Sequence, residues 1–245
     1  MDALTALRLQ LEWGVDEALE ALPINRLAAP ASVRALVLPA GPAARAAQVA
    51  EACSTVEALR EALAGFDGCA LRTTATNLVF ADGNPQARLM LVGEAPGGEE
   101  DRAGLPFVGP SGRLLDRMMA SIGLDRRHFL ITNLIPWRPP GNRNPTDSEV
   151  VLCLPFLLRH IALTRPRRLV LLGSLSTRAI TGSATGIRRM RGRWIELPVP
   201  GLDRPVPTLP MLHPAYLLRT PGAKRDAWSD LLMLRRALDT DELMK

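Results

Sequence analysis

The stretch LMLVGEAPGGEEDRAGLPFVGPSG, from Leu89 to Gly112, decides the fold. An apolar run is followed by a Gly/Pro turn, by four acidic residues and by a second glycine-rich bend that contains Phe107. Such a run predicts a buried strand that delivers polar groups to the carboxyl edge of a sheet. Because open α/β sheets bind their ligands at that edge, we expect a ligand site around Glu94.

Strand and helix patterns alternate through most of the chain. We predict strands over residues 76–80, 88–93, 129–133, 168–173, 194–197 and 207–212, with a turn over residues 81–85. Helical spacing predicts helices over residues 113–122, 146–163, 174–180 and 228–238. This repeated order predicts a three-layer α/β/α fold around a mostly parallel sheet.

The first 65 residues carry no chemistry that the sequence reveals. Their spacing predicts an amphipathic helix, a linker and a second helix ended by Gly65, over residues 1–26, 27–42 and 43–64 respectively. We therefore divide the chain into a helical N-terminal extension with a linker, residues 1–65, and an α/β domain, residues 66–245.

Composition and charge narrow the class of protein. Of the 245 residues, 47% are hydrophobic but only 4% are aromatic, so the core must be mostly aliphatic. Lys and Arg (30) outnumber Asp and Glu (25), and the net charge of +5 favours a polyanionic partner such as nucleic acid. No apolar run approaches the roughly 18 residues that a membrane span needs. We expect a cytoplasmic monomer that does not bind membranes.

Three predicted strands end in polar loops. The first runs into Gly93–Gly97, the second ends at Asn133, and the last ends at His213. In a parallel sheet these ends lie on one edge, so residues that are far apart in sequence can share a pocket.

These loops resemble the uracil-DNA glycosylase superfamily, and most closely its family four. The resemblance runs from Cys69 to about Leu238, and the first 65 residues lie outside it. The matching stretches, in chain order, are GEAPGGEED (93–101), GLPFVG (104–109), ITN (131–133), RPPGNRNP (138–145), LGSLSTRAI (172–180), RGRW (191–194) and HPAYLLR (213–219).

The resemblance implies a monofunctional enzyme that flips deoxyuridine out of DNA and releases uracil, leaving an abasic site. Phe107 matches the residue that stacks on the flipped base, and Asn133 matches the residue that reads its edge. A side-chain amide can donate to O4 and accept from N3–H, a pairing that cytosine would frustrate. Gly93 and Ala95 fall at the remaining substrate-binding positions.

Four residues match the catalytic positions of the family. His213 matches the residue that hydrogen-bonds uracil O2 in the transition state. Glu94 and Glu100 match its acidic residues, one of which orients or activates water at C1′, and Asn142 matches a residue that helps to hold that water. The sequence leaves open which glutamate dominates.

A basic and apolar set matches the surfaces that contact DNA. Leu217, Leu218 and Arg219 match a loop that wedges into the duplex where the base has left, and Arg191 belongs to a run of arginines that can hold phosphates. The expected partner is therefore uracil-containing DNA.

The chain departs from the family at its iron–sulfur ligands. Family four typically binds a four-iron, four-sulfur cluster through four cysteines, whose positions here are Phe66, Cys69, Trp137 and Cys153. Because such clusters need four thiolates, we predict that no cluster or other metal is bound, that Cys69 and Cys153 are remnant ligand positions, and that the two aromatic residues fill the vacated volume.

Two other functions compete with the glycosylase interpretation. One is a uracil-DNA or abasic-site binding protein with slow or no turnover. The loop 135–145 has no histidine and no insertion, unlike the relatives that capture DNA covalently, but slow product release stays open. The other is a nucleotide-binding enzyme that uses GEAPGG as a phosphate loop. It is disfavoured because acids fill the loop and the Lys-Ser/Thr pair of a Walker motif is missing.

Overall fold

The computed structural model describes residues 41–243, so the predictions for residues 1–40 lie outside the described part of the chain. Six strands form one sheet in the order β1-β3-β2-β4-β6-β5. Strands β2, β3, β4 and β6 run parallel, and the two edge strands are antiparallel to their neighbours. The strands are β1 Ala81–Gly83, β2 Leu89–Gly93, β3 Leu130–Asn133, β4 Arg168–Leu172, β5 Ile195–Leu197 and β6 Val206–Met211.

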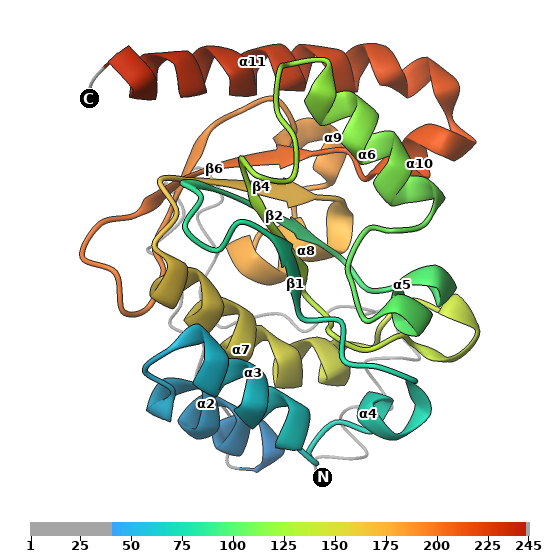
Figure 1. Ribbon diagram of the computed structural model, residues 1–245, viewed down its shortest axis with the longest axis vertical. Helices are drawn as coiled ribbons and strands as arrows, with labels where there is room; N and C mark the ends of the chain where they lie inside the picture. Colours follow the sequence, from blue (N-terminus) through green and yellow to red (C-terminus); the bar gives the residue numbers. More distant parts are fainter. Residues whose placement is uncertain (1–40, 244–245) are drawn as a thin grey trace, which may run out of the picture. The chain divides into compact units, whose positions relative to one another are not determined.

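Helices cover both faces of this sheet. Figure 1 shows α7, α2 and α3 on one side of the strands and α6 and α11 on the other. The predicted three-layer α/β/α fold is thereby confirmed. The helices are α2 Pro42–Ala52, α3 Val56–Gly65, α4 Leu71–Thr74, α5 Gly98–Ala103, α6 Pro110–Ala120, α7 Asp147–Thr164, α8 Ser174–Thr181, α9 Ile187–Met190, α10 Pro214–Arg219 and α11 Lys224–Leu243, with the 3₁₀ turns η1 Pro140–Asn142 and η2 Pro221–Ala223.

Alternating side chains of the strands build two separate hydrophobic clusters. In β2, Met90 and Val92 belong to the cluster under α2, α3 and α7, whereas Leu89 and Leu91 belong to the cluster under α6 and α11. All four side chains are at most 2% exposed. A strand buried on both faces reads as a continuous apolar run, which is why the stretch before Glu94 has no polar alternation.

Two predicted elements differ from the structure. Residues 76–80 form no strand, and the edge strand β1 instead occupies Ala81–Gly83, where a turn was predicted. The predicted helix over 43–64 is two helices, because Thr55 caps the start of α3 by accepting a hydrogen bond from the backbone nitrogen of Ala58 at 3.1 Å. Threonine is a favoured N-cap residue, so it interrupts a helical pattern that hydrophobic spacing alone would continue.

Helices α2 and α3 pack against α7 and share its hydrophobic cluster. The proposed division of the chain after residue 65 therefore runs between two parts that share one core. None of the helices within residues 41–243 is long and apolar enough to cross a membrane.

Two ion pairs hold helix α11, one to Arg191 at the end of α9 and one to Arg168 of β4. Asp230, with 0% of its surface exposed, accepts hydrogen bonds from Arg191, and Asp241 is bonded by the Nε and Nη2 atoms of Arg168 at 2.6 and 2.8 Å. Breaking a buried pair by removing one partner leaves an uncompensated charge, at a cost of roughly 3 to 5 kcal/mol. These pairs fix α11 over its cluster.

Candidate active site

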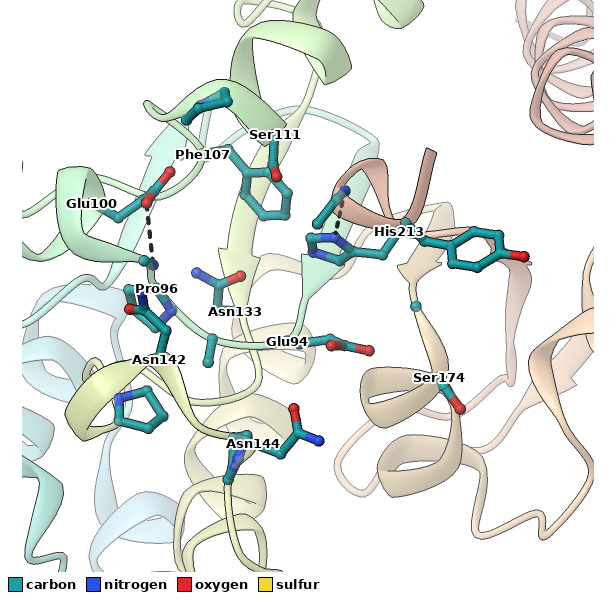
Figure 2. A pocket seen from close by; sticks show the side chains of 18 of the residues that line it. Glu94, Pro96, Glu100, Phe107, Ser111, Asn133, Asn142, Asn144, Ser174 and His213 are labelled. Carbon is teal, nitrogen blue, oxygen red and sulfur yellow. Dashed lines mark hydrogen bonds between the residues drawn. The ribbon is translucent and has the colours of Figure 1, made fainter. Parts of the chain in front are cut away.

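The carboxyl ends of the four parallel strands open into one pocket of about 810 Å³. Strand β2 lies between β3 and β4. The connection after β2 therefore runs to one side of this strand, and the connection after β3 crosses to its other side. Ligands of open α/β sheets bind at such a switch point. Figure 2 shows side chains from several strand ends pointing into this space. Eight of the predicted residues line it: Glu94, Ala95, Glu100, Phe107, Asn133, Asn142, His213 and Arg219. Gly93 lies against the side chains of Asn133 and Phe107.

The floor of the pocket is built by Gly93, Phe107 and Asn133. Gly93 pairs with Asn133 across β2 and β3, and a β-carbon at Gly93 would collide with the Asn133 side-chain oxygen and the Phe107 ring. Asn133 is 4% exposed, and its Oδ1 has no hydrogen-bond partner within residues 41–243. An unpartnered buried acceptor costs roughly 1 to 3 kcal/mol. The pocket therefore holds an acceptor that is ready for a ligand N–H.

Phe107 sits on a constrained backbone. Its φ of 57° lies in the left-handed region, which a non-glycine residue rarely adopts. Arg126 holds this conformation, because its Nη2 donates to the Phe107 carbonyl oxygen at 2.7 Å while its other nitrogens bond Asp82 and Asp116 at 2.9 and 2.7 Å. The ring lies 5.7 Å from that of His213 with 30° between the planes. The Phe107 ring thus gives the pocket floor a flat aromatic surface in a fixed position.

His213 is the N-cap of α10 and is neutral. Its Nδ1 accepts a hydrogen bond from the backbone nitrogen of Ala215 at 3.1 Å, so Nδ1 carries no proton and Nε2 carries the hydrogen. Burial, with a smaller contribution from Arg219, lowers the pKa of His213 to about 4. The imidazole can therefore donate a hydrogen bond from Nε2 at neutral pH without bearing a charge.

Glu94 and Glu100 have different surroundings, which separates the two candidate acids. Glu94 lines the pocket, and its Oε1 accepts a hydrogen bond from the backbone nitrogen of Leu175 at 2.9 Å, at the start of α8. Burial raises the pKa of Glu94, and the backbone donors of Leu175 and Ser174 oppose that shift. A carboxylate with a raised pKa in a cleft is a candidate general base.

Glu100 instead ties two loops together. Its Oε1 accepts from the backbone nitrogen of Gly109 at 2.7 Å, and its Oε2 accepts from that of Gly97 at 3.1 Å. Both oxygens are thus occupied by the protein, as Figure 2 shows for the bond to the loop before α5. This geometry fits a residue that positions the loops better than one that activates water.

Asn142 lies on η1 with a φ of 55°, and its Oδ1 accepts a hydrogen bond from the Nε of Arg138 at 2.7 Å. Asn144, which the sequence analysis did not select, also lines the pocket. Figure 2 shows its amide pointing toward Glu94. Sequence reasoning also missed Gly173, where a β-carbon would collide with the Glu94 carboxylate. The matched stretch LGSLSTRAI already marked that glycine.

Two of the four residues predicted to contact DNA, Leu217 and Arg191, are engaged inside the protein. Leu217 is 1% exposed and packs in the cluster under α6 and α11, so it cannot reach DNA from this position. Arg191 is committed to Asp230 and to the backbone oxygen of Asp226. In contrast, Leu218 is 43% exposed. Arg219 lines the pocket, and so does Arg188, which belongs to the same run of arginines as Arg191.

The four implied iron–sulfur positions are packed together but do not fit a cluster. Phe66, Cys69, Trp137 and Cys153 are each at most 3% exposed and belong to one hydrophobic cluster. The Phe66 ring packs 5.2 Å from that of Phe156, while a hydrogen bond with Cys153 lowers the pKa of Cys69. Two thiols and two carbon rings do not provide four thiolates. Within residues 41–243, no three His, Cys, Asp or Glu side chains are grouped to hold a metal.

Comparison with known proteins agrees with this geometry. A model of the uracil DNA glycosylase superfamily matches residues 80–232. The type-4 uracil-DNA glycosylase of Pyrobaculum aerophilum is 35% identical over 182 residues, which cover 73% of this chain and 92% of the relative. That of Archaeoglobus fulgidus is 40% identical over 166 residues, covering 66% and 82%. That of Thermotoga maritima is 37% identical over 165 residues, covering 67% and 83%. This chain belongs to the uracil-DNA glycosylase superfamily.

Proposed function

We propose that the protein is a monofunctional DNA glycosylase that hydrolyses the N-glycosidic bond of deoxyuridine in DNA, releasing uracil and leaving an abasic site. The observation that carries this proposal is the buried, unpartnered Oδ1 of Asn133 beside the fixed ring of Phe107. Together they offer a stacking surface and an acceptor for an imide N–H. Three relatives at 35 to 40% identity are named type-4 uracil-DNA glycosylases, which supports the same substrate.

Recognition of the base follows from the two faces of the Asn133 amide. Its Oδ1 accepts from uracil N3–H, and its Nδ2 donates to O4. Cytosine has an acceptor at N3 and an amino group at C4, so both contacts would become repulsive. A site built to hydrogen-bond one edge rejects the mismatched edge strongly, because its own buried groups are then left unpaired.

Departure of uracil is assisted by His213. As the glycosidic bond breaks, negative charge develops on the uracil ring and its O2, and the Nε2–H of a neutral imidazole can donate to that oxygen. A preorganised donor of this kind typically contributes about 10² to 10³ in rate. The bond from Ala215 to Nδ1 keeps the donor tautomer in place.

Water attack is assigned to Glu94. The carboxylate lines the pocket and has one oxygen held by the start of α8. In its ionised form it accepts a proton from water as the water attacks C1′, and its charge stabilises the oxocarbenium-like sugar. No lysine is among the described residues that line the pocket, so water rather than a Schiff-base amine is proposed as the nucleophile. Glu100 is proposed to position the loops.

The DNA is proposed to lie across the pocket mouth, with Leu218 entering the stack that the base has left and Arg219 at the phosphates. We further propose that the protein works as a cytoplasmic monomer and binds no iron–sulfur cluster, because two of the four ligand positions are aromatic side chains packed in the core.

A labelled oligonucleotide with one uracil tests the activity. Release of uracil is followed by alkaline cleavage of the abasic strand, on single- and double-stranded substrates. Multiple turnovers are expected. A single burst equal to the protein concentration would point to a binding protein that retains its product. An intact strand after prolonged incubation with excess protein would remove the glycosylase proposal altogether.

A further inference from the structure

The hydrogen bond between Arg138 and Asn142 determines how the Asn142 amide is oriented. The Nε of Arg138 donates to Oδ1 of Asn142 at 2.7 Å. A guanidinium has five N–H donors and no acceptor, so only the oxygen of the amide can face it. The Nδ2 atom must then be on the other side. Although Asn oxygen and nitrogen atoms are often exchanged in structures, the chemistry of arginine leaves one orientation here.

The backbone beneath Asn142 depends on its surroundings. Asn142 and Gly141 have φ values of 55° and 65°, and both lie in a turn that follows two prolines, Pro139 and Pro140. Asparagine tolerates the left-handed region better than most residues but still at a cost. A residue in this conformation persists where neighbouring groups hold it. Arg138 is the neighbour that bonds the side chain.

Arg138 lies against the loop after β2. A β-carbon built on Gly98 would lie 3.4 Å from Cζ, Nη1 and Nη2 of Arg138 alike. The guanidinium therefore turns its flat face to the side of Gly98 from which a β-carbon would project. Gly98 begins α5, directly after Gly97, whose backbone nitrogen is bonded by Glu100. Arg138 therefore links the loop after β3 to the loop that carries Glu94.

We propose that Arg138 is a positioning residue of this site, which holds the Asn142 amide with its nitrogen directed at the pocket. Asn142 lines the pocket and Arg138 does not, so Arg138 acts through Asn142. This inference rests on the proposed function and assigns Asn142 the role of a hydrogen-bond donor. Its acceptor is an oxygen atom, either of the attacking water or of a phosphate beside the flipped nucleotide.

Single-turnover rates of uracil release at saturating protein test the coupling. Arg138→Ala and Asn142→Ala are each expected to lower the rate about 10- to 100-fold, the range for a hydrogen bond that involves a charged group. The double variant should be no slower than Asn142→Ala, because the two residues act as one unit. Two independent losses that multiply would overturn the proposal.

Further variants separate positioning from general damage. Asn142→Asp keeps the bond to Arg138 and removes the donor, so it should lose as much activity as Asn142→Ala. Near wild-type activity would mean that the oxygen is the working atom, against the proposal. Arg159→Ala is the matched control, because the Nε of Arg159 also holds a loop oxygen, that of Cys53, at 2.8 Å but far from the pocket. It should keep the wild-type rate.

The pH profile and the affinity for DNA locate the acceptor. Loss of Arg138 should lower the rate plateau without moving the acid limb, since a general distortion would shift the titration of Glu94. If the acceptor is a phosphate, Asn142→Ala should also bind uracil-containing DNA more weakly, with an unchanged salt dependence because the amide carries no charge. If the acceptor is the attacking water, the affinity should stay constant and only the rate should fall.

A spectroscopic measurement reads the contact without using activity. The side-chain amide signals of Asn142 can be assigned in a ¹⁵N–¹H spectrum by their loss in Asn142→Asp. They should move in Arg138→Ala and stay in place in Arg159→Ala. Unmoved signals in Arg138→Ala would overturn the inference. A wild-type protein that releases no uracil would instead contradict the proposed function and leave this measurement as the test of Arg138.

Discussion

Two buried regions of the molecule contain polar groups, and they treat them in opposite ways. At the pocket, Asn133 is 4% exposed and its Oδ1 has no hydrogen-bond partner in the described part of the chain. Around Phe66, Cys69 and Cys153 are 1% and 2% exposed, and their free thiols share a hydrogen bond. The pocket thus leaves one buried hydrogen-bond acceptor free, whereas the two thiols around Phe66 are each other's partners. A buried acceptor without a partner is a place where a ligand can add a favourable hydrogen bond. Buried groups that already have partners serve the stability of the fold.

Removing the unmet acceptor should have the largest effect. Asn133→Ala is expected to lower the single-turnover rate of uracil release by roughly 10² to 10³, the range for loss of one preorganised polar contact in an active site. His213→Ala should fall in the same range. The free energy of unfolding, measured with urea, should change little. Variants that fold and release uracil at the wild-type rate would contradict the site assignment.

The opposite result is expected in the packed cluster. Phe66→Ala removes a ring that is 3% exposed and should lower the free energy of unfolding by roughly 3 to 5 kcal/mol. The rate per folded molecule should stay near that of the wild type, because the ring does not line the pocket. A large loss of rate with full stability would erase the distinction between the two regions.

His160 is the exception that sharpens the contrast. Its Nε2 is buried on the face of the sheet that α7 covers and has no hydrogen-bond partner among the residues that the structure describes. It lies next to a cavity of about 20 Å³, which is large enough for one water molecule. The ring stacks 4.7 Å from that of Phe80. A cavity of this size has room for a water molecule but not for a larger ligand.

Burial lowers the pKa of His160 to about 4, so the folded state keeps this group neutral while the unfolded chain takes up a proton below the ordinary value of about 6.5. The stability contribution is complete above that value and is lost as pH falls toward 4. Wild type should lose about 2 to 3 kcal/mol more than His160→Gln between pH 7 and 4.5. Urea unfolding at the two pH values measures the difference, and equal losses would contradict it.

The pH dependence of the rate should report Glu94. Burial raises the pKa of its carboxyl, and the ionised form is the one that accepts a proton. The rate should therefore fall about tenfold per pH unit below that pKa, with a midpoint above the ordinary carboxyl value. His213 stays neutral down to a pH of about 4. In Glu94→Gln the limb should disappear together with most of the activity, and a retained limb would assign it to another group.

The smallest effect is expected at the remnant cysteines. Cys69→Ser and Cys153→Ser should keep the rate within about twofold, because neither cysteine lines the pocket and changes away from the site rarely affect chemistry. Iron and sulfide assays with a visible spectrum complete the comparison. A brown protein with about four irons per chain would overturn the proposal that no cluster is bound.

The sequence predicted the centre of the fold and of the site well, for a physical reason. Strand β2 is buried on both faces, so its apolar run is unbroken and ends where the chain reaches solvent. Asn133 and His213 end two further buried strands, and a parallel sheet brings such ends together. The local sequence around Asn133 and His213 was therefore enough to predict that both residues lie at this edge of the sheet.

Orientation could not be predicted in the same way. Leu217 and Leu218 are adjacent and alike, and only the packing of α10 on α6 decides that the first is buried and the second exposed. Arg191 faces inward because Asp230, 39 residues later, pairs with it. The preference of Glu100 for two backbone nitrogens also depends on how two loops meet. Contacts between distant segments decide these roles.

The pairing of Arg191 with Asp230 has a consequence for synthesis on the ribosome. Arg191 and strand β6 leave the ribosome before helix α11 does. The carboxylate that neutralises Arg191 belongs to α11. Leu231 and Leu234 of that helix also complete the cluster beneath it. Until α11 has left the exit tunnel, the part of this cluster that α11 covers stays exposed, because a domain generally folds as a unit. A nascent chain stalled before α11 should therefore be open to proteases.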